Sequence, residues 1–319
     1  MGHGCPLVHK AFRATPGPDL ALEPFTDMAQ QTLTPHVAQA ADRARETARD
    51  TVREASPGLI WLGRCGFAAK GAVYVLIGVA ASRAALGMGD ETIDTHGALG
   101  RIMEMPFGSW LLGAVAVGLL GYTIWRAVQA LLDTEHKGSD LKGVWVRGSY
   151  LLSAAIYATL TLAAVRLLID AGAQSGNGEG ATQDWTARLL EQPFGPWLVA
   201  LVGVGLIGSA AFQLIRAGTA DFRDRLQTST MSSREQAVAV WAGRFGHIAR
   251  GATFATMGFF LILAAFRQNP GEAKGLAGAL NSLAEQPYGP LLLGAVATGL
   301  AFYGVYMFIE ARYRRIVMT

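Results

Sequence analysis

Six apolar runs limit most strongly what this sequence can fold into. They span residues 67–86, 107–125, 148–169, 194–215, 248–266 and 288–309. An α-helix rises about 1.5 Å per residue, so about twenty apolar residues cross the roughly 30 Å hydrocarbon core of a bilayer. Buried helices of soluble proteins are usually shorter, and six such runs with short polar connections are not typical of them. The pattern predicts an all-α integral membrane protein with six transmembrane helices.

The composition excludes several other classes of protein. Of the 319 residues, 51% are hydrophobic and only 16% are charged, whereas soluble domains are about 25% charged. Two cysteines, Cys5 and Cys65, cannot build a disulfide framework. The formal net charge of +3 is too small to indicate a nucleic-acid partner. We therefore expect a lipid bilayer as the surroundings and no nucleic acid as a partner.

A polar tail, residues 1–57, precedes the first run. Its start lacks the continuous apolar segment of a signal peptide, and Gly2 to Pro24 has the Pro- and Gly-rich composition of a disordered segment. Residues 36–55 are rich in Ala, Arg, Asp and Glu, and charged residues recur there at a spacing of four, which predicts a solvated helix. Whether Met1 or Met28 starts the chain is left open.

The first, third and fifth runs carry an internal repeat. Six residues of the first copy recur 180 positions later in the third; the pairs are Trp61/Trp241, Arg64/Arg244, Gly66/Gly246, Lys70/Arg250, Gly71/Gly251 and Tyr74/Phe254. A weaker middle copy lies 83 positions after the first, with Arg147 in place of Arg64 and Tyr157 in place of Tyr74. This middle copy departs from the pattern at Ser149, Ser153 and Ala154.

The second, fourth and sixth runs share a Pro-aromatic-Gly element at their start and a glycine about halfway along. The repeated residues are Pro106, Gly108 and Gly118, then Pro193, Gly195 and Gly205, then Pro287, Gly289 and Gly299. Proline is tolerated in the first helical turn, and a glycine in mid-membrane lets a neighbouring helix approach closely. Apolar residues at helical spacing upstream predict a short interfacial helix before each of these runs.

Together the two repeats indicate three copies of a two-helix hairpin, at residues 58–135, 140–220 and 236–315. Because each copy has an even number of spans, every copy enters the membrane from the same side. We therefore expect three parallel repeats arranged as a pseudo-threefold bundle.

The distribution of Lys and Arg predicts the orientation. Of the 27 such residues, 21 lie on the side that carries both termini, and 6 lie on the other side. By the positive-inside rule this places the N- and C-termini in the cytoplasm.

Seven basic residues are candidate contacts for a small anion or an anionic lipid headgroup: Lys70, Arg250, Arg64, Arg244, Arg147, Arg126 and Arg216. Arg64 and Arg244 lie at the membrane interface, and Lys70 and Arg250 each follow them by six residues. Lys70 and Arg250 therefore lie about 9 Å deeper in the membrane. A charge at that depth costs roughly 1 to 3 kcal/mol unless it snorkels, pairs or lines a wet cavity. One explanation is snorkelling towards the headgroups. The other is a basic vestibule facing the cytoplasm, since no acidic residue lies in the middle of the first, third or fifth run.

The three copies resemble the bacterial membrane family called domain of unknown function 1206. The resemblance spans about residues 61–315 and rests on Trp or Val three positions before Arg in the odd runs and on Pro-aromatic-Gly in the even ones. It implies a six-helix protein of the bacterial inner (plasma) membrane with a triplicated two-helix unit, and it carries no assigned reaction.

Signals of catalysis or of bound groups are weak. His96, His136 and His247 have no Ser, Cys or carboxylate at a recognisable catalytic spacing. His3, Cys5 and His9 lack a fourth metal ligand. We therefore expect no enzymatic activity, no cofactor, no metal and no catalytic residues.

Two functions of different class remain open at this point. The first is binding or passage of a small anion or an anionic lipid headgroup. The second is a structural or partner-binding role, in which residues 36–55 recruit a cytoplasmic protein.

Overall fold

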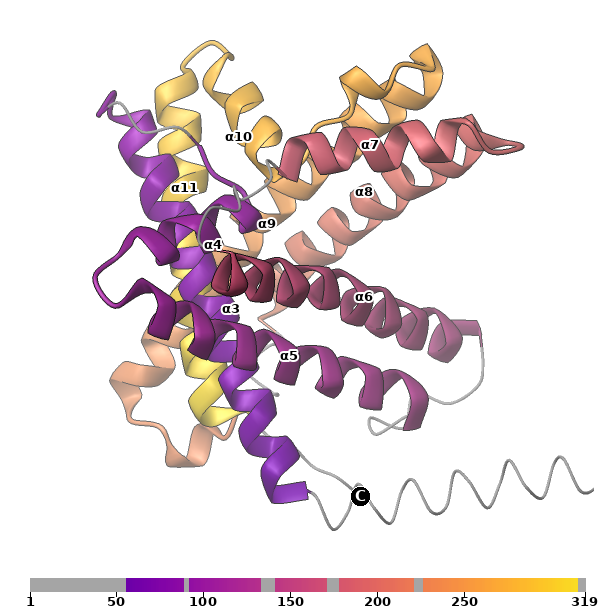
Figure 1. Ribbon diagram of the computed structural model, residues 1–319. Helices are drawn as coiled ribbons and strands as arrows, with labels where there is room; N and C mark the ends of the chain where they lie inside the picture. The colour runs from indigo at the N-terminus through magenta and orange to yellow at the C-terminus, as the bar shows by residue number, and fades with distance from the viewer. Residues whose placement is uncertain (1–55, 89–91, 133–140, 171–177, 221–225, 315–319) are drawn as a thin grey trace, which may run out of the picture. The chain divides into compact units, whose positions relative to one another are not determined.

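The computed structural model describes residues 56–88, 92–132, 141–170, 178–220 and 226–314. The long helices in these ranges are α3 (Ser56–Ala85), α5 (Gly108–Leu132), α6 (Leu141–Ile169), α8 (Gly195–Thr219), α9 (Ser233–Arg267) and α11 (Gly289–Tyr313) (Figure 1). All six are long and apolar enough to cross a membrane. The predicted apolar spans are confirmed, and they indicate a multi-pass membrane protein.

Some predictions fall on other parts of the chain. The tail at 1–57, apart from its last two residues, lies outside the described residues. The same is true of the helix expected at 36–55 and of Met1 and Met28. The protein partner expected at 36–55 and the start of the chain therefore stay predictions.

The first, third and fifth spans, which are helices α3, α6 and α9, begin earlier in the chain than their apolar runs predict. Helix α9 begins at Ser233, whereas the apolar run begins at residue 248. Its start is a capping box, in which the Ser232 hydroxyl accepts from the Glu235 N–H at 3.3 Å and the Glu235 carboxylate accepts from the Ser232 N–H at 2.8 Å. An apolar run marks the hydrocarbon-facing stretch, but hydrogen bonding sets the helix end. Helices α3 and α6 likewise begin before their apolar runs.

Short helices precede the second, fourth and sixth spans, which are helices α5, α8 and α11, as the sequence predicts. They are α4 (Thr95–Glu104), α7 (Gly178–Leu190) and α10 (Leu276–Ala284). Leu99 of α4 and Leu280 of α10 are completely buried, so these two helices pack into the protein rather than only lying on its surface. Two single turns of 3-10 helix, η2 (Thr228–Thr230) and η3 (Pro270–Glu272), flank α9.

The Pro-aromatic-Gly element is a tight turn with one geometry in all three copies. The aromatic residue adopts the left-handed conformation each time, with φ of 61°, 62° and 63° at Phe107, Phe194 and Tyr288. The next residue is packed so closely on the preceding helix that a Cβ would overlap a backbone oxygen. This applies to Gly108, Gly195 and Gly289. The glycine is therefore required by lack of space, which explains why it recurs.

The long helices pack side by side in the order α6, α5, α3, α11, α9, α8 (Figure 1). Within the first repeat α3 packs on α5, and within the third repeat α9 packs on α11. The hairpin expected for the second repeat is not formed, because α6 and α8 share no packed face within the described residues. The parallel pseudo-threefold arrangement stays a prediction.

The glycines in the middle of the spans also separate the first and third repeats, whose two helices pack together, from the second repeat, whose helices do not. A Cβ on Gly118 would overlap Ala69, and one on Gly299 would overlap Ala249, so both glycines admit a neighbouring helix as predicted. The packing expected at Gly205 is wrong, since a Cβ there meets no atom of the described residues within 4 Å. In the second repeat Gly203 is the tightly packed residue instead, against α9 at Gly258. Helix α8 thus packs on its sequence neighbour from the third repeat.

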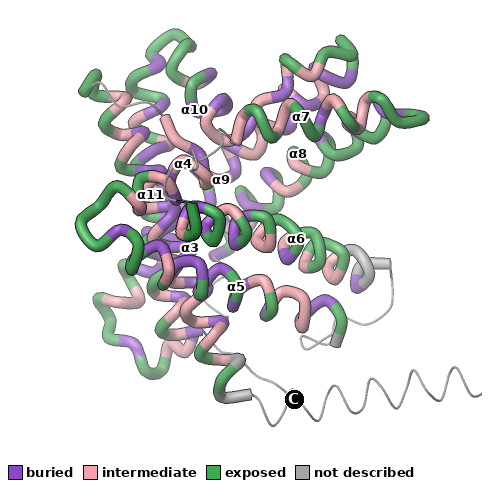
Figure 2. Tube along the Cα trace, in the orientation of Figure 1, coloured by how far each residue is buried: buried purple, intermediate pink, exposed green. Residues whose placement is uncertain are grey.

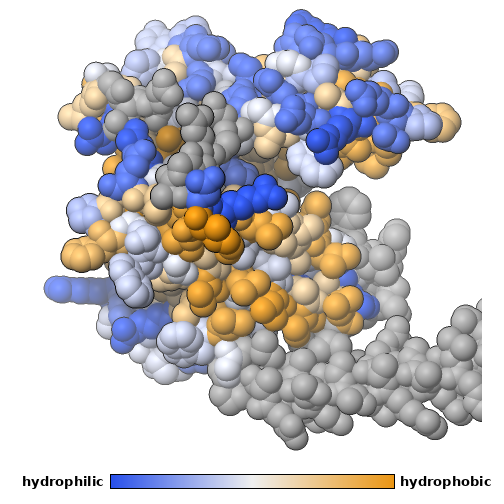
Figure 3. All heavy atoms as spheres, in the orientation of Figure 1, coloured by the Kyte–Doolittle hydropathy of each residue, from blue (hydrophilic) through white to orange (hydrophobic). Residues whose placement is uncertain are grey.

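Burial is concentrated on α3 and α11, and α6 and α8 are more exposed (Figure 2). The fully buried side chains include Phe67, Ile77, Tyr122 and Tyr306. On the face shown in Figure 3, hydrophobic residues gather over α5 and α6, and hydrophilic residues gather over α7 and α10. This separation is expected where one band of the surface faces lipid and the next faces headgroups and water.

Candidate binding site

A cavity of about 120 Å³ lies among the six long helices, and every one of them contributes to its lining. The basic lining residues are Lys70, Arg126, Arg216, Arg250 and Arg314, and the acidic one is Glu310. Four tyrosines, Tyr122, Tyr157, Tyr303 and Tyr306, add hydroxyl groups. With all these groups in their usual charge states, the lining carries four more positive than negative charges.

Corresponding positions of the three repeats meet at this cavity. Ser153 and Arg250 lie 83 and 180 positions after Lys70, and all three residues line the cavity. Tyr303 of α11 lies 181 positions after Tyr122 of α5, and the same spacing separates Pro106 from Pro287. The repeats therefore supply the same places around the cavity but fill them with different side chains.

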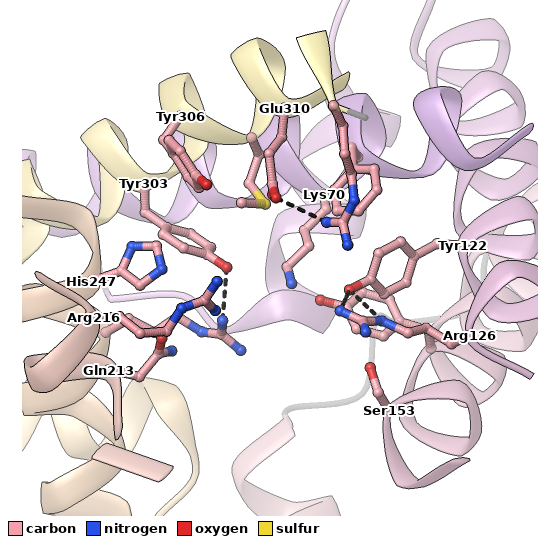
Figure 4. Close-up of a pocket in the computed structure, with 15 residues that line it drawn as sticks. Lys70, Tyr122, Arg126, Ser153, Gln213, Arg216, His247, Tyr303, Tyr306 and Glu310 are labelled. Atoms are coloured by element: carbon pink, nitrogen blue, oxygen red, sulfur yellow. Dashed lines mark hydrogen bonds and ion pairs between the residues drawn. The ribbon is translucent and has the colours of Figure 1, made fainter. Parts of the chain in front are cut away.

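Lys70 is buried, with 5% of its surface exposed. Its ammonium lies 5.2, 5.4 and 5.7 Å from the ring centroids of Tyr122, Tyr157 and Tyr303. Among the described residues it makes no hydrogen bond and no ion pair. Figure 4 shows the ammonium pointing into the space between Tyr303 and Arg216 on one side and Tyr122 and Arg126 on the other. Cation–π contacts offset only part of the cost of burying a charge.

Arg250 is held by aromatic groups and not by a carboxylate. Its Nη1 donates to the hydroxyl oxygen of Tyr303 at 2.7 Å, and its guanidinium lies 4.7 Å from the ring centroid of Phe254. The Nε atom is buried without a hydrogen-bond partner in the described part of the chain. The guanidinium charge is therefore not neutralised by any described side chain.

Arg126 is arranged in a similar way on the opposite side of the cavity. Its Nε and Nη2 donate to the hydroxyl oxygen of Tyr122 at 2.9 and 2.7 Å. Its Nη1 donates to the side-chain oxygen of Gln129 at 3.2 Å, and its guanidinium stacks 4.9 Å from the ring centroid of Tyr150. Arg126 forms no ion pair with a described carboxylate.

An ion pair between two described residues borders the cavity. Arg314 Nη1 donates to Glu310 Oε1 at 2.9 Å, and both side chains are only 6% exposed. The Arg314 guanidinium also lies 4.6 Å from the ring centroid of Phe67 in α3. Glu310 therefore neutralises Arg314, and no other described carboxylate pairs with Lys70, Arg126 or Arg250.

The structure brings four of the seven candidate basic residues together. Lys70, Arg126, Arg216 and Arg250 line the cavity. Snorkelling requires a side chain that extends to the protein surface. The low exposure of Lys70 shows that its side chain does not do so.

The other three candidates lie elsewhere. Arg64 is partly buried away from the cavity, and Arg244 is exposed. Arg147 donates to the carbonyl oxygen of Ala130 at 2.8 Å, near the end of α5. A basic side chain there satisfies a carbonyl left free at a helix C-terminus, which is a structural role.

Several lining residues were not singled out from the sequence. Glu310 is not predicted as an acidic partner of the basic residues, because it lies on α11, the sixth span, and not on the first, third or fifth span. The spacing shared by Tyr122 and Tyr303 was a usable signal, since both lie 16 residues after a conserved feature of the repeat, at Pro106 and Pro287. Within the described ranges, no group of three or more His, Cys, Asp or Glu side chains is placed to hold a metal ion.

Comparison with known proteins identifies relatives but no solved structure. The family described as Domain of Unknown Function (DUF1206) matches residues 65–133, 148–220 and 245–314. The uncharacterized protein YxxB of Bacillus subtilis (strain 168) is 38% identical over 264 residues, which is 82% of this chain and 94% of that protein. No solved structure matches. The matched segments are the three repeats, and the chain belongs to the DUF1206 family.

Proposed function

We propose that the protein binds an oxyanion in the central cavity. The observation that carries the proposal is Lys70, a buried ammonium that points into the cavity and has no ion-pair partner among the described residues. Arg126 and Arg250 likewise have only phenolic, amide and aromatic contacts. Buried charges are normally paired, since desolvation costs several kcal/mol per ion. A bound anion would offset that cost for all three cations.

The hydrogen-bonding groups suit an oxyanion. The hydroxyl oxygens of Tyr122 and Tyr303 accept from Arg126 and Arg250, so their protons are available to donate to a ligand. The Lys70 ammonium adds further donors. Such groups match the acceptor oxygens of a phosphate, sulfate or carboxylate, and the cavity volume fits a group of that size.

The proposal extends to the surroundings of the protein. We propose a bacterial inner-membrane location, with three parallel repeats in a pseudo-threefold arrangement and with both termini in the cytoplasm. The cavity lining includes Tyr303 and Glu310 in the last part of α11 and Arg314 just after it, so the cavity lies nearer the end of the bundle at which α3 begins and α11 ends. The excess of Lys and Arg on that side supports a cytoplasmic position for it. No catalytic activity is proposed.

A pair of variants on one helix tests the proposal. Arg250→Gln removes a cation of the cavity, and Arg244→Gln removes an exposed cation six residues earlier in α9. We expect millimolar inorganic phosphate or sulfate to raise the unfolding temperature of the purified wild-type protein and of Arg244→Gln. Arg250→Gln should lose that shift. Absence of any shift in the wild type with phosphate, sulfate and acetate, or an equal shift in both variants, would overturn the proposal.

A further inference from the structure

A helix–helix interface is left vacant in the second repeat. In the first repeat α5 contacts α3 where Gly118 meets Ala69, and in the third repeat α11 contacts α9 where Gly299 meets Ala249. The corresponding residue of α8 is Gly205, which is exposed and at which a Cβ would meet no described atom within 4 Å. The side of α8 that would pack on α6, the other helix of the second repeat, is therefore uncovered.

The sequence of α6 explains why this interface is not formed. Leu152 occupies the position of Ala69 and Ala249, so a large side chain stands where the other repeats have a methyl group. Ser149 occupies the position of Gly66, where a Cβ would overlap the backbone of α5. Close packing of membrane helices depends on small residues at the contact. The second repeat has lost them, and the ring of helices is open between α6 and α8.

This opening borders the cavity. Ser153 and Tyr157 of α6 and Gln213 and Arg216 of α8 all belong to the cavity lining. Gly205 lies eleven residues before Arg216, which is about three helical turns, so both residues lie on the same face of α8. A molecule placed between α6 and α8 beside Gly205 would therefore extend along α8 towards Arg216.

The surface on either side of the opening is apolar. Helices α6 and α8 are the two spans least buried inside the protein. Leu152 of α6 is 64% exposed, and Phe212 of α8 is 55% exposed. A small anion that arrives from water has no need of such a surface. A ligand with hydrocarbon chains and a charged headgroup does, because its chains stay in an apolar environment when the headgroup enters the cavity.

From these observations we infer that the ligand is an anionic phospholipid, with its phosphate in the cavity and its acyl chains between α6 and α8. This rests on the proposed function, since the phosphate is the oxyanion that neutralises Lys70. A second copy of this chain is a poorer occupant. Its helix would cover the apolar surface but would leave the buried ammonium without a counter-charge.

Two probes separate the lipid from a free anion. The full-length protein is purified in a neutral detergent, and native mass spectrometry measures retention of added phosphatidylglycerol against phosphatidylcholine. Inorganic phosphate is tested separately by thermal stabilisation. We expect the wild type to retain phosphatidylglycerol in preference to phosphatidylcholine by about tenfold, a difference of about 1.4 kcal/mol. Lys70→Met should lose both this preference and the stabilisation by phosphate.

Variants of α8 test the route. Gly205→Trp fills the opening, and Gly218→Trp places the same side chain on α8 about 140° away, at a second glycine with nothing within 4 Å. Gly205→Trp should lower retention of phosphatidylglycerol about tenfold, whereas Gly218→Trp should retain it like the wild type. Gly205→Leu, a smaller obstruction, serves as a second variant, and the unfolding temperature of each variant shows that it is folded.

The outcomes distinguish the two proposals. If phosphate stabilises the wild type but phosphatidylglycerol shows no preference, or if Gly205→Trp retains lipid as Gly218→Trp does, the lipid inference fails and oxyanion binding stands. If neither probe binds, both fail. A dimer without bound lipid that dissociates in Gly205→Trp would assign the opening to a second copy of the chain and overturn the inference.

Discussion

At the scale of single residues, Lys70 sets the energetics of the cavity. Its ammonium is held by three tyrosine rings and by no carboxylate among the described residues. Such contacts contribute about 0.5 to 2 kcal/mol each, whereas desolvation of a buried charge costs several kcal/mol. The two sums are of the same order, and because no described carboxylate adds to the contacts, we expect Lys70 to lower the stability of the ligand-free protein.

This balance predicts the sign of a mutation. Lys70→Met, which keeps the length of the side chain and removes the charge, should raise the free energy of unfolding of the ligand-free protein by about 1 kcal/mol or more. Lys274→Met is the control, because Lys274 donates to Ser282 and stacks on Phe260, and its loss should destabilise. Denaturant unfolding in detergent measures both changes. A large loss of stability in Lys70→Met would show that the ammonium has a structural role instead.

The ion pair at the cavity edge leads to a second residue-scale prediction. Glu310→Gln removes the carboxylate that pairs with the buried Arg314 guanidinium, and we expect it to lower the free energy of unfolding by about 3 to 5 kcal/mol. The double variant Glu310→Leu with Arg314→Leu should recover most of that loss, because neither charge of this pair is then buried without the other. Thermal unfolding of the two variants compares them directly. Equal destabilisation by both would contradict the pairing.

At the scale of elements, the turn before each even-numbered span depends on a glycine with no free space. Gly289→Ala would place a Cβ against the backbone of Ala284, so we expect a loss of about 1 to 3 kcal/mol. Gly294→Ala, five residues later in α11, would meet only the Ala85 methyl at 3.7 Å and should be neutral or stabilising by up to about 1 kcal/mol. Unfolding in detergent compares the two. A tolerated Gly289→Ala would contradict this account of the turn.

The mid-span glycines give a test of the vacant interface. Gly299→Leu would force α11 away from Ala249 and should destabilise by several kcal/mol or prevent folding. Gly205→Leu meets open space and should leave the unfolding temperature unchanged or raised. The yield of monodisperse protein and its thermal unfolding report on both variants. If Gly205→Leu destabilises as Gly299→Leu does, α6 and α8 are packed together in the membrane.

At the scale of the whole molecule, the end of the bundle that holds the cavity is predicted to face the cytoplasm. We expect a cysteine introduced at Ser233, exposed at the start of α9, to react with a membrane-impermeant maleimide only after the inner membrane is made permeable. A cysteine at Gln286, exposed before α11, should react in intact spheroplasts. Both are introduced after Cys5 and Cys65 are replaced by serine. The opposite labelling pattern would reverse the orientation.

Features of this protein that depend on local pattern could be predicted from the order of the amino acids. Span lengths follow from the bilayer thickness, and the three turns follow from Pro-aromatic-Gly, because proline and glycine act on the backbone at their own positions. The repeat pattern also predicted that the middle copy differs from the other two, because Ser149 and Ser153 replace the glycine and the basic residue found in them. These features need no knowledge of which helix lies beside which.

Tertiary structure alone decided which residues share the cavity and where the bundle is open. Glu310 lies one helical turn before Arg314, the residue that follows the end of α11, but its place in a cavity with Lys70 depends on how α11 packs on α3. Leu152 and Ser149 on α6 stand where the other repeats have small residues, but only the packed structure shows that α8 packs on α9 and leaves the side towards α6 open within the described residues. Helix packing in lipid is set by the close fit of whole faces and not by hydropathy, which is similar on every span.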